Sequence, residues 1–325
     1  MSRPRLLLCV AIVLAPLAGW VALYRLSDDL LRPPRPRLAD PPGSAPGVSA
    51  GSLRGLGATG VPSASLPATP ADLGLPFREV SFQGGFGLTA RGWYIPAPDA
   101  VGSLVILHGN ASNRRAGLSF APSLHAAGFA LLLFDFTGRG DSDGEFCTYG
   151  WREAEDARQA ARLAARLAPG VPVALLGRSL GAAVAILAAA DPQDAPIDAV
   201  VADSSFASLA DLVALRRAEM HIPAWPFEPL YYAVVRLRSG FDPRSIDVER
   251  AARRVSVPVL LLHGTEDRDI PFEHSQRIAA ALAGPHDFVP IPGSGHNGVR
   301  PAEILERIRS FLATTLRGEA HRIEI

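Results

Sequence analysis

The sequence predicts an α/β fold in which a mostly parallel sheet is covered by helices on both faces. Short apolar segments bounded by glycine and polar residues recur along the chain, as is typical of buried strands. Helical patterns with an apolar face separate several of these segments, which is the order of βαβ units. Hydrophobic residues make up 48% of the 325 residues, enough to fill the core of such a domain.

The folded domain is expected at residues 75–316. It should begin with an antiparallel hairpin, whose strands 78–82 and 88–95 flank the pair Gly84-Gly85. Helices are expected at 153–168, where alanine and leucine recur on one face, at 180–190, and after each of the last two strands. The remaining strands are predicted at 103–107, 129–136, 171–176, 199–202, 257–262 and 288–291.

The N-terminal part of the chain differs in composition from the rest. Residues 1–5 form a short flank with two arginines, and residues 6–24 are apolar and uncharged over a length that can span a bilayer. We predict an uncleaved membrane anchor there. The alternatives are a cleaved signal peptide, whose best site after Ala18 has Pro16 at an unfavourable position, and a buried core helix.

The anchor hypothesis has consequences for the segments around it. Arginines flank the apolar run on both sides, but a very short N-terminus favours placing the catalytic domain on the non-cytoplasmic side. Residues 25–74 are rich in proline, glycine and alanine, which predicts a disordered linker. Residues 317–325 are expected to be a polar tail.

Charge and cysteine content exclude several classes of function. The formal net charge is zero, so nothing favours nucleic acid as a partner. The two cysteines, Cys9 and Cys147, lie in unlike segments, so no disulfide between them is expected. No group of histidines and cysteines has the spacing of a zinc site, and we expect neither a metal nor another cofactor.

The candidate nucleophile is Ser179, in the run Gly177-Arg178-Ser179-Leu180-Gly181. An apolar strand leads into this run and an alanine-rich helix leaves it. A sharp turn from strand to helix needs small residues beside the nucleophile, and the two glycines supply them. The hydroxyl would then lie near a helix N-terminus, which favours a developing oxyanion. The alternative is an ordinary serine in a βα turn.

A serine hydroxyl becomes a good nucleophile only when a base takes its proton. His296 is the preferred base because it lies in the glycine-rich loop 292–297, directly after the last predicted strand. Catalytic groups of open α/β sheets gather at that edge. The other histidines that follow Ser179 are expected at a turn, a helix start, a strand start, the insertion described below and the tail: His263, His274, His286, His221 and His321.

An acid should accept the imidazole N–H and fix its tautomer. Asp267 is the preferred candidate, followed by Asp269; Glu266 lies in the same segment after a strand. Asp203 ends the preceding strand and is a third possibility. Asp269 and Glu266 can equally be surface charges.

Two backbone groups are candidates for the oxyanion hole. They are the N–H of Asn110, after the strand that ends in His108-Gly109, and the N–H of Leu180. Residues 135–144 contain acids and glycines without the spacing of a calcium loop, so we expect a solvated turn that braces the site.

An insertion at about residues 206–254 precedes the next strand and contains the apolar, aromatic run 221–232. It is expected to be either a lid over an apolar acyl pocket or a helix packed on the core.

Together these motifs resemble the α/β-hydrolase superfamily over residues 75–316. The runs at 108–110, 135–140, 177–181 and 295–297 are similar to those of membrane-anchored α/β-hydrolase-domain proteins, a group that includes acyl-protein thioesterase-like members. The resemblance implies an α/β-hydrolase fold with a small cap and a triad at Ser179, Asp267 and His296. The long linker departs from that pattern.

The resemblance also implies a serine hydrolase that cleaves an acyl ester or thioester through an acyl-enzyme. Its substrate would be a small or lipid-like acyl compound or an acylated protein. The alternatives are a serine peptidase of the same fold and a non-catalytic binding protein that keeps the fold.

Overall fold

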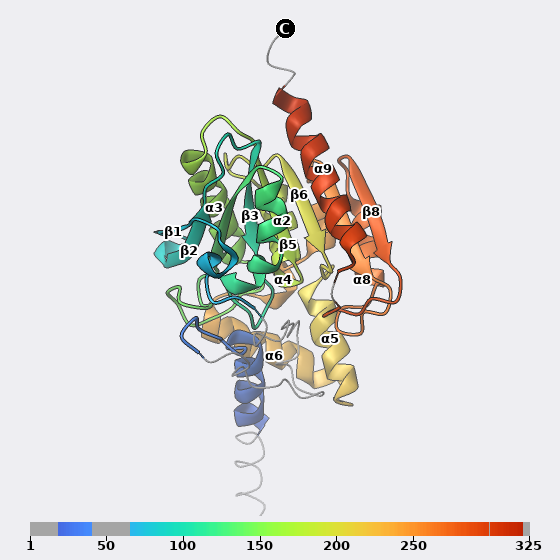
Figure 1. The fold of residues 1–325 in the computed structure, drawn as a ribbon. Coiled ribbons are helices and arrows are strands. Elements are labelled where there is room, and N and C mark those ends of the chain that lie inside the picture. The colour runs from blue at the N-terminus through green and yellow to red at the C-terminus, as the bar shows by residue number, and fades with distance from the viewer. Residues whose placement is uncertain (1–18, 41–65, 299, 321–325) are drawn as a thin grey trace, which may run out of the picture.

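The computed structural model describes residues 19–40, 66–298 and 300–320 (Figure 1). Its centre is one eight-stranded sheet in the order β1-β2-β4-β3-β5-β6-β7-β8. The pairs β1–β2 and β2–β4 are antiparallel, and the other neighbours run parallel. The strands are β1 (Arg78–Gln83), β2 (Thr89–Ile95), β3 (Gly102–Leu107), β4 (Phe129–Asp135), β5 (Val173–Arg178), β6 (Ala199–Asp203), β7 (Val259–Gly264) and β8 (His286–Ile291). Each predicted strand is confirmed, with its ends shifted by a few residues.

Helices cover both faces of the sheet because its central strands are apolar on both sides. In β3, Val105 belongs to one core cluster, whereas Leu104 and Ile106 belong to the other. The first cluster lies under α3, α4 and α8, and the second under α2 and α9. The helices are α2 (Ala121–Ala126), α3 (Glu153–Leu167), α4 (Leu180–Ala190), α5 (Leu209–Glu219), α6 (Ala224–Ser239), α7 (Val248–Ala252), α8 (Glu273–Ala281) and α9 (Ala302–Ala320).

The insertion between β6 and β7 forms α5, α6 and α7. One face of α6 joins the main core, where Phe227 and Tyr231 stack with ring centroids 5.2 Å apart. The inner face of α6 therefore agrees with the expectation of a helix packed on the core. The opposite face of α6 is exposed.

The N-terminal segment differs from the predicted disordered linker. Residues 19–31 are helical, and Leu30 and Leu31 are fully buried in the main core. Arg35 donates hydrogen bonds to the carbonyl oxygens of Gly140 at 3.0 Å and Gly144 at 2.6 Å. The prediction of a disordered linker is therefore wrong for residues 25–40. The average composition of the segment did not reveal its short amphipathic helix, nor that Arg35 binds carbonyl oxygens of a distant loop.

The domain also begins before residue 75, since residues 70–73 form a 3₁₀ turn. Residues 6–18 of the predicted anchor and the linker residues 41–65 lie outside the described residues. Among the helices that are described, none is both long and apolar enough to span a bilayer.

The first part of the loop, residues 135–140, is buried rather than solvated, which corrects the prediction there, whereas Asp143 is exposed. Asp135 is fully buried and accepts hydrogen bonds from the backbone N–H groups of Arg114 at 2.7 Å and Asp141 at 3.0 Å. Burial raises the pKa of Asp135 to about 6, against the opposing charge of Arg114. The loop thus belongs to the core that supports the carboxyl ends of β3 and β4.

Candidate active site

Ser179 lies in a tight turn between β5 and α4. Its φ of 56° and ψ of −118° are sparsely populated for a residue with a side chain. A Cβ on Gly177 would lie 2.1 Å from the carbonyl oxygen of Gly181, and one on Gly181 would lie 2.1 Å from that of Leu107. The packing therefore requires both glycines of the motif, which brings the start of α4 against the end of β3.

The structure brings Ser179, His296 and Asp267 together, although they come from three different loops. The Nε2 atom of His296 lies 3.0 Å from Ser179 Oγ, and its Nδ1 atom lies 2.5 Å from Asp267 Oδ2. A carboxylate accepts only, so Nδ1 carries the proton and Nε2 is free to accept the serine proton. All three side chains are buried.

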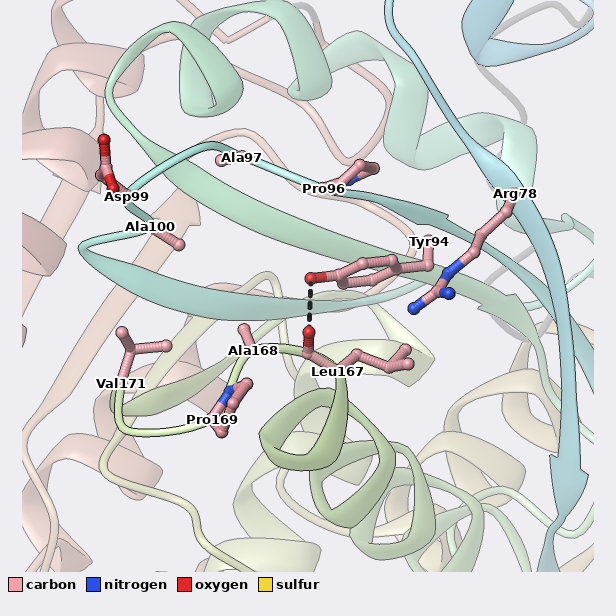
Figure 2. Close-up of a pocket in the computed structure, with 10 residues that line it drawn as sticks. All are labelled: Arg78, Tyr94, Pro96, Ala97, Asp99, Ala100, Leu167, Ala168, Pro169 and Val171. Carbon is pink, nitrogen blue, oxygen red and sulfur yellow. Dashed lines mark hydrogen bonds between the residues drawn. The ribbon is translucent and has the colours of Figure 1, made fainter.

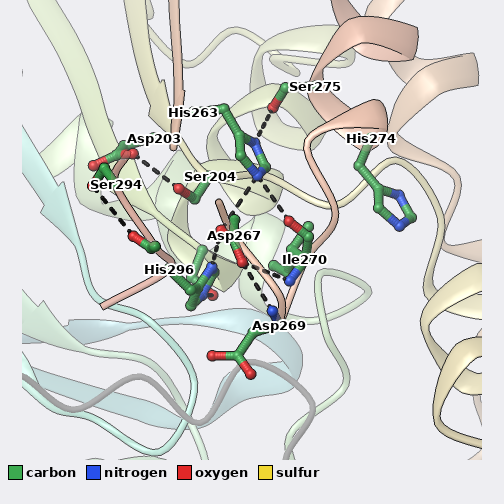
Figure 3. A network of polar contacts seen from close by, with 12 residues as sticks. Asp203, Ser204, His263, Asp267, Asp269, Ile270, His274, Ser275, Ser294 and His296 are labelled. Carbon is green, nitrogen blue, oxygen red and sulfur yellow. Dashed lines mark hydrogen bonds and ion pairs between the residues drawn. The ribbon is translucent and has the colours of Figure 1, made fainter. Parts of the chain in front are cut away.

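The Asp267 carboxylate has further hydrogen-bond partners besides His296 (Figure 3). Its Oδ1 atom accepts from the backbone N–H groups of Asp269 at 3.0 Å and Ile270 at 2.9 Å, and its Oδ2 atom lies 3.3 Å from His263 Nε2. Burial alone would raise the pKa of Asp267, but the hydrogen bonds from His263 and His296 outweigh it and lower that pKa below its ordinary value. Asp267 is therefore ionised at neutral pH.

The other candidate acids have different partners. Asp203 is buried and binds Arg300 through both carboxylate oxygens, at 2.7 and 2.8 Å. Asp269 forms an ion pair with Arg216 at 3.4 Å, and Glu266 is exposed. Neither Asp203 nor Asp269 has a hydrogen bond to His296.

The other candidate histidines have different partners or are exposed. His263 is fully buried between the Ser275 hydroxyl and the carbonyl oxygen of Ile270, at 2.6 and 2.8 Å (Figure 3). His274 accepts from the backbone N–H of Ala207, whereas His221 and His286 are exposed. His321 lies outside the described residues.

Two arginines that sequence reasoning did not identify hold the His296 loop. Arg178, inside the serine motif, donates to the carbonyl oxygen of His296 at 2.6 Å and to that of Gly298 at 3.1 Å. Arg300 donates to Ser294 Oγ at 2.8 Å while it binds Asp203. The position of Arg178 next to the serine was a signal for its role, but no pattern marks Arg300.

Replacing Arg300 with alanine is expected to lower the free energy of unfolding by about 3 kcal/mol, because it leaves the buried Asp203 carboxylate without its main partner. The control is Arg309→Ala, which removes an exposed ion pair with Glu306 and should cost less than about 1 kcal/mol. Urea unfolding measures both changes. Equal losses in the two variants would contradict this assignment.

Both predicted oxyanion donors lie where β3 meets α4. Leu180 is the first residue of α4, where backbone N–H groups have no acceptor within the helix. Asn110 is buried; its side-chain Nδ2 donates to the Tyr149 hydroxyl at 3.0 Å and its Oδ1 accepts from Arg139. The Asn110 side chain is thus held by other residues of the protein.

The N-terminal segment packs against the connection between β4 and α3, which contains Arg139 and Cys147. Arg139 is buried and donates to the carbonyl oxygens of Pro33 at 3.1 Å and Pro34 at 3.2 Å, in addition to its bond with Asn110. The carbonyl oxygen of Leu31 accepts a hydrogen bond from the backbone N–H of Cys147 at 2.8 Å. Residues 31–35 therefore support the residue proposed to bind the oxyanion.

The Cys147 thiol should be unreactive in the folded protein. Burial raises its pKa to about 12, and only a thiolate reacts readily with disulfide reagents. In a Cys9→Ser variant, which leaves one thiol, we expect no reaction with Ellman's reagent at pH 8 until the protein is unfolded. Rapid reaction before unfolding would show that residues 31–35 do not stay packed on this loop.

A surface pocket lies at the opposite end of the sheet (Figure 2). Its wall includes Tyr94, whose hydroxyl donates to the carbonyl oxygen of Leu167 at 3.2 Å, and residues that precede β3 and β5, such as Ala100 and Val171. None of the predicted site residues lines it. Across the described residues, no group of three or more histidine, cysteine or acidic side chains could hold a metal ion.

Comparisons with known proteins agree with this architecture. A family model described as serine aminopeptidase, S33, matches residues 98–237. An uncharacterized protein of Mycobacterium tuberculosis is 34% identical over 264 residues, which cover 78% of this chain and 84% of that protein. The human protein ABHD12B is 30% identical over 205 residues, or 57% of this chain and 51% of its own length.

A solved structure extends the likeness to the fold. The esterase Pf2001 of Pyrococcus furiosus superposes with a TM-score of 0.63 at 24% identity, over 76% of this chain and 94% of the esterase.

Proposed function

Because this chain belongs to the α/β-hydrolase superfamily and is a hydrolase of the esterase/peptidase type, we propose that it cleaves acyl esters or thioesters with Ser179 as nucleophile. The observation that carries the proposal is the hydrogen-bonded chain from Ser179 through His296 to Asp267. Ester cleavage is favoured over other acyl transfers because the fold neighbour named above is an esterase.

In the proposed mechanism, Ser179 Oγ attacks the acyl carbon while His296 Nε2 takes its proton. The N–H groups of Leu180 and Asn110 stabilise the oxyanion of the tetrahedral intermediate. Collapse expels the alcohol or thiol, which receives the proton from His296. A water molecule then attacks the acyl-enzyme with His296 as base, and Ser179 leaves with the proton.

Asp267 keeps the imidazole in the tautomer that these steps need. Its ionised carboxylate also stabilises the imidazolium that forms when His296 takes the serine proton. The buried ion pair of Asp203 with Arg300, together with Arg178, fixes the loop that carries His296. The residues of the site thus divide into those that react and those that position them.

A fluorophosphonate probe tests the nucleophile. We expect the protein to be labelled, the Ser179→Ala variant to remain unlabelled, and a Ser119→Ala control, which removes an exposed serine, to be labelled as the wild type is. Persistent labelling of Ser179→Ala would rule out this residue as the nucleophile.

A peptidase is the second candidate, because the matching family model is described as a serine aminopeptidase. Hydrolysis of p-nitrophenyl esters of graded chain length, compared with p-nitroanilides of the same acyl groups, separates the two activities. Faster turnover of the anilides would favour the peptidase. Absence of turnover for either series, in a folded protein, would favour a non-catalytic role.

We further propose that residues 6–24 anchor the chain in a membrane, with the catalytic domain on the non-cytoplasmic side. The support is their uncharged apolar sequence. Fractionation tests it: release by high salt, or a mature N-terminus after Ala18, would contradict an uncleaved anchor.

A further inference from the structure

The exposed apolar side chains of this protein are concentrated at one end of the domain. Within the described residues, the large hydrophobic side chains left exposed belong to the helical segment 19–31, to α6, to the turn between β1 and β2 and to the turn that precedes α3. They are Trp20, Val21, Tyr24, Phe86, Trp151, Trp225, Leu230 and Leu237. Exposed hydrophobic groups gathered on one side of a molecule indicate an interaction surface.

These elements lie at the end of the sheet that carries the catalytic residues. In Figure 1 the arrowheads of β6 and β8 point toward the end where α5, α6 and the blue helical segment lie, and that segment projects beyond the domain there. The guanidinium of Arg238 on α6 lies 3.8 Å from the ring centroid of Tyr24 and donates to the Tyr24 carbonyl oxygen at 2.9 Å. The helical segment and α6 therefore form one continuous surface.

Phe86 and Trp151 extend the same surface. Their ring centroids are 4.6 Å apart, and Trp151 stacks on Phe241, two residues beyond the end of α6, at 6.1 Å. The exposed aromatic rings thus follow the end of the domain from the first hairpin to α6.

Helix α6 carries apolar residues on its inner face and also on its outer face, although it lies at the protein surface. Its inner face packs into the core through Phe227, Tyr231 and Val235. On the outer face, Leu230 and Leu237 are 49% and 80% exposed and lie seven residues apart, which places them on one side of the helix. Trp225, at the start of α6, is 78% exposed. The fold itself does not require these outer apolar residues.

We propose that this surface, formed by the outer face of α6 and by Trp20, Val21 and Tyr24, lies in the interface of a lipid bilayer. Tryptophan and tyrosine favour the level of the lipid headgroups, and apolar helix faces flanked by arginine bind anionic membrane surfaces. Arg25 and Arg236 are exposed beside the apolar residues. Trp20, Val21 and Tyr24 belong to the last residues of the uncharged apolar run 6–24, so the proposed anchor would leave the bilayer at this same surface.

Membrane contact at this end would turn the catalytic edge of the sheet toward the lipid. An acyl chain could then pass from the bilayer to Ser179 beneath the cap without crossing water. On the basis of the proposed function, the substrate class is an acyl ester or thioester whose chain resides in a membrane. The docking surface itself does not depend on the enzyme's activity.

The surface can be tested without measuring hydrolysis. In the full chain with Cys9→Ser, where the remaining Cys147 is buried, one exposed cysteine is introduced at a time, Leu230→Cys or Leu237→Cys, to carry the environment-sensitive fluorophore NBD. Arg166→Cys is the control. Residue 166 is exposed at the end of α3, next in the chain to Leu167, which lines the pocket at the opposite end of the sheet from Ser179. Labelled protein is added to vesicles of phosphatidylcholine and phosphatidylglycerol that contain brominated acyl chains.

We expect quenching at positions 230 and 237 to exceed that at 166 by about twofold or more, because only the first two labels reach the acyl region. Equal quenching at all three positions would overturn the proposal. A change in the labels at 230 and 237 with protein concentration, in the absence of vesicles, would also overturn it, since a second copy would then cover this surface.

The consequence for the substrate has its own test. The double variant Leu230→Glu/Leu237→Glu should hydrolyse a soluble short-chain p-nitrophenyl ester as the wild type does, but should lose about tenfold or more of its activity on a long-chain ester embedded in vesicles. Equal losses on both substrates would overturn the docking surface as the cause. Absence of activity in the wild type would count against the proposed function and leave the quenching result as the test of the surface.

Discussion

Replacing Ser179 with alanine is expected to lower kcat for ester hydrolysis by about a millionfold, to the level left by binding and the oxyanion donors alone. The reason is geometric: Ser179 Oγ is the atom within hydrogen-bond distance of His296 Nε2, and alanine offers no nucleophile there. Steady-state hydrolysis of a p-nitrophenyl ester measures the change.

The control for this variant is Ser119→Ala, which should keep wild-type kcat. Circular dichroism should show that both variants remain folded. If Ser179→Ala retained more than about a hundredth of the activity while folded, the acyl group would have to be transferred by another residue or directly to water.

Replacing Asp267 with asparagine is expected to lower kcat by about ten thousandfold with little change in KM. The amide oxygen of asparagine can still accept from Asp269 and Ile270, but the residue no longer carries the charge that stabilises the imidazolium of His296. An amide facing Nδ1 also favours the tautomer in which Nε2 carries the proton and cannot accept one from Ser179. The Asp269→Asn control should retain most of the activity, because Asp269 contributes only its backbone N–H to the site.

The same variant gives a prediction about pH. The pKa of Asp267 is lower in the folded protein than in the unfolded chain, so its ionised form favours folding above the unfolded pKa. That contribution is lost as the pH falls through the folded value. The difference in unfolding free energy between wild type and Asp267→Asn should therefore be largest near neutral pH and shrink below about pH 4. A difference that is constant from neutral to acidic pH would contradict a lowered pKa.

Local sequence patterns were enough to predict the strands, the main helices and the order of the site residues. The central strands of the sheet are short, apolar and bounded by residues that end them, so the pattern depends on neighbours along the chain. Ser179 and His296 could be chosen for the same reason, since Ser179 directly follows a strand between two glycines and His296 lies in the glycine-rich loop after the last strand. The parallel sheet then accounts for their meeting, because the carboxyl ends of its strands share one edge.

Long-range contacts of single side chains could not be predicted in this way. Asp203, Asp267 and Asp269 all follow strands, and only the packing shows that Asp203 binds Arg300 while Asp267 reaches His296. Arg300 has no motif around it, because its role depends on a carboxylate 97 residues away in sequence.

Long-range contacts also explain why the N-terminal segment was predicted wrongly. Its proline and glycine content predicted disorder, yet Leu30 and Leu31 are buried and the carbonyl oxygens of Pro33 and Pro34 bind Arg139. These contacts are made with a loop more than a hundred residues away, and composition carries no information about them.

The sequence by itself therefore determined the class of fold and selected the candidate nucleophile and base, because these choices depend on periodicity and on residues next to one another in the chain. The tertiary structure alone decided which carboxylate contacts His296, which arginines hold the His296 loop, and that residues 25–40 pack on the domain. Those decisions rest on the pairing of buried charges and carbonyl groups, and the partner of such a group is set by the packing of the whole chain.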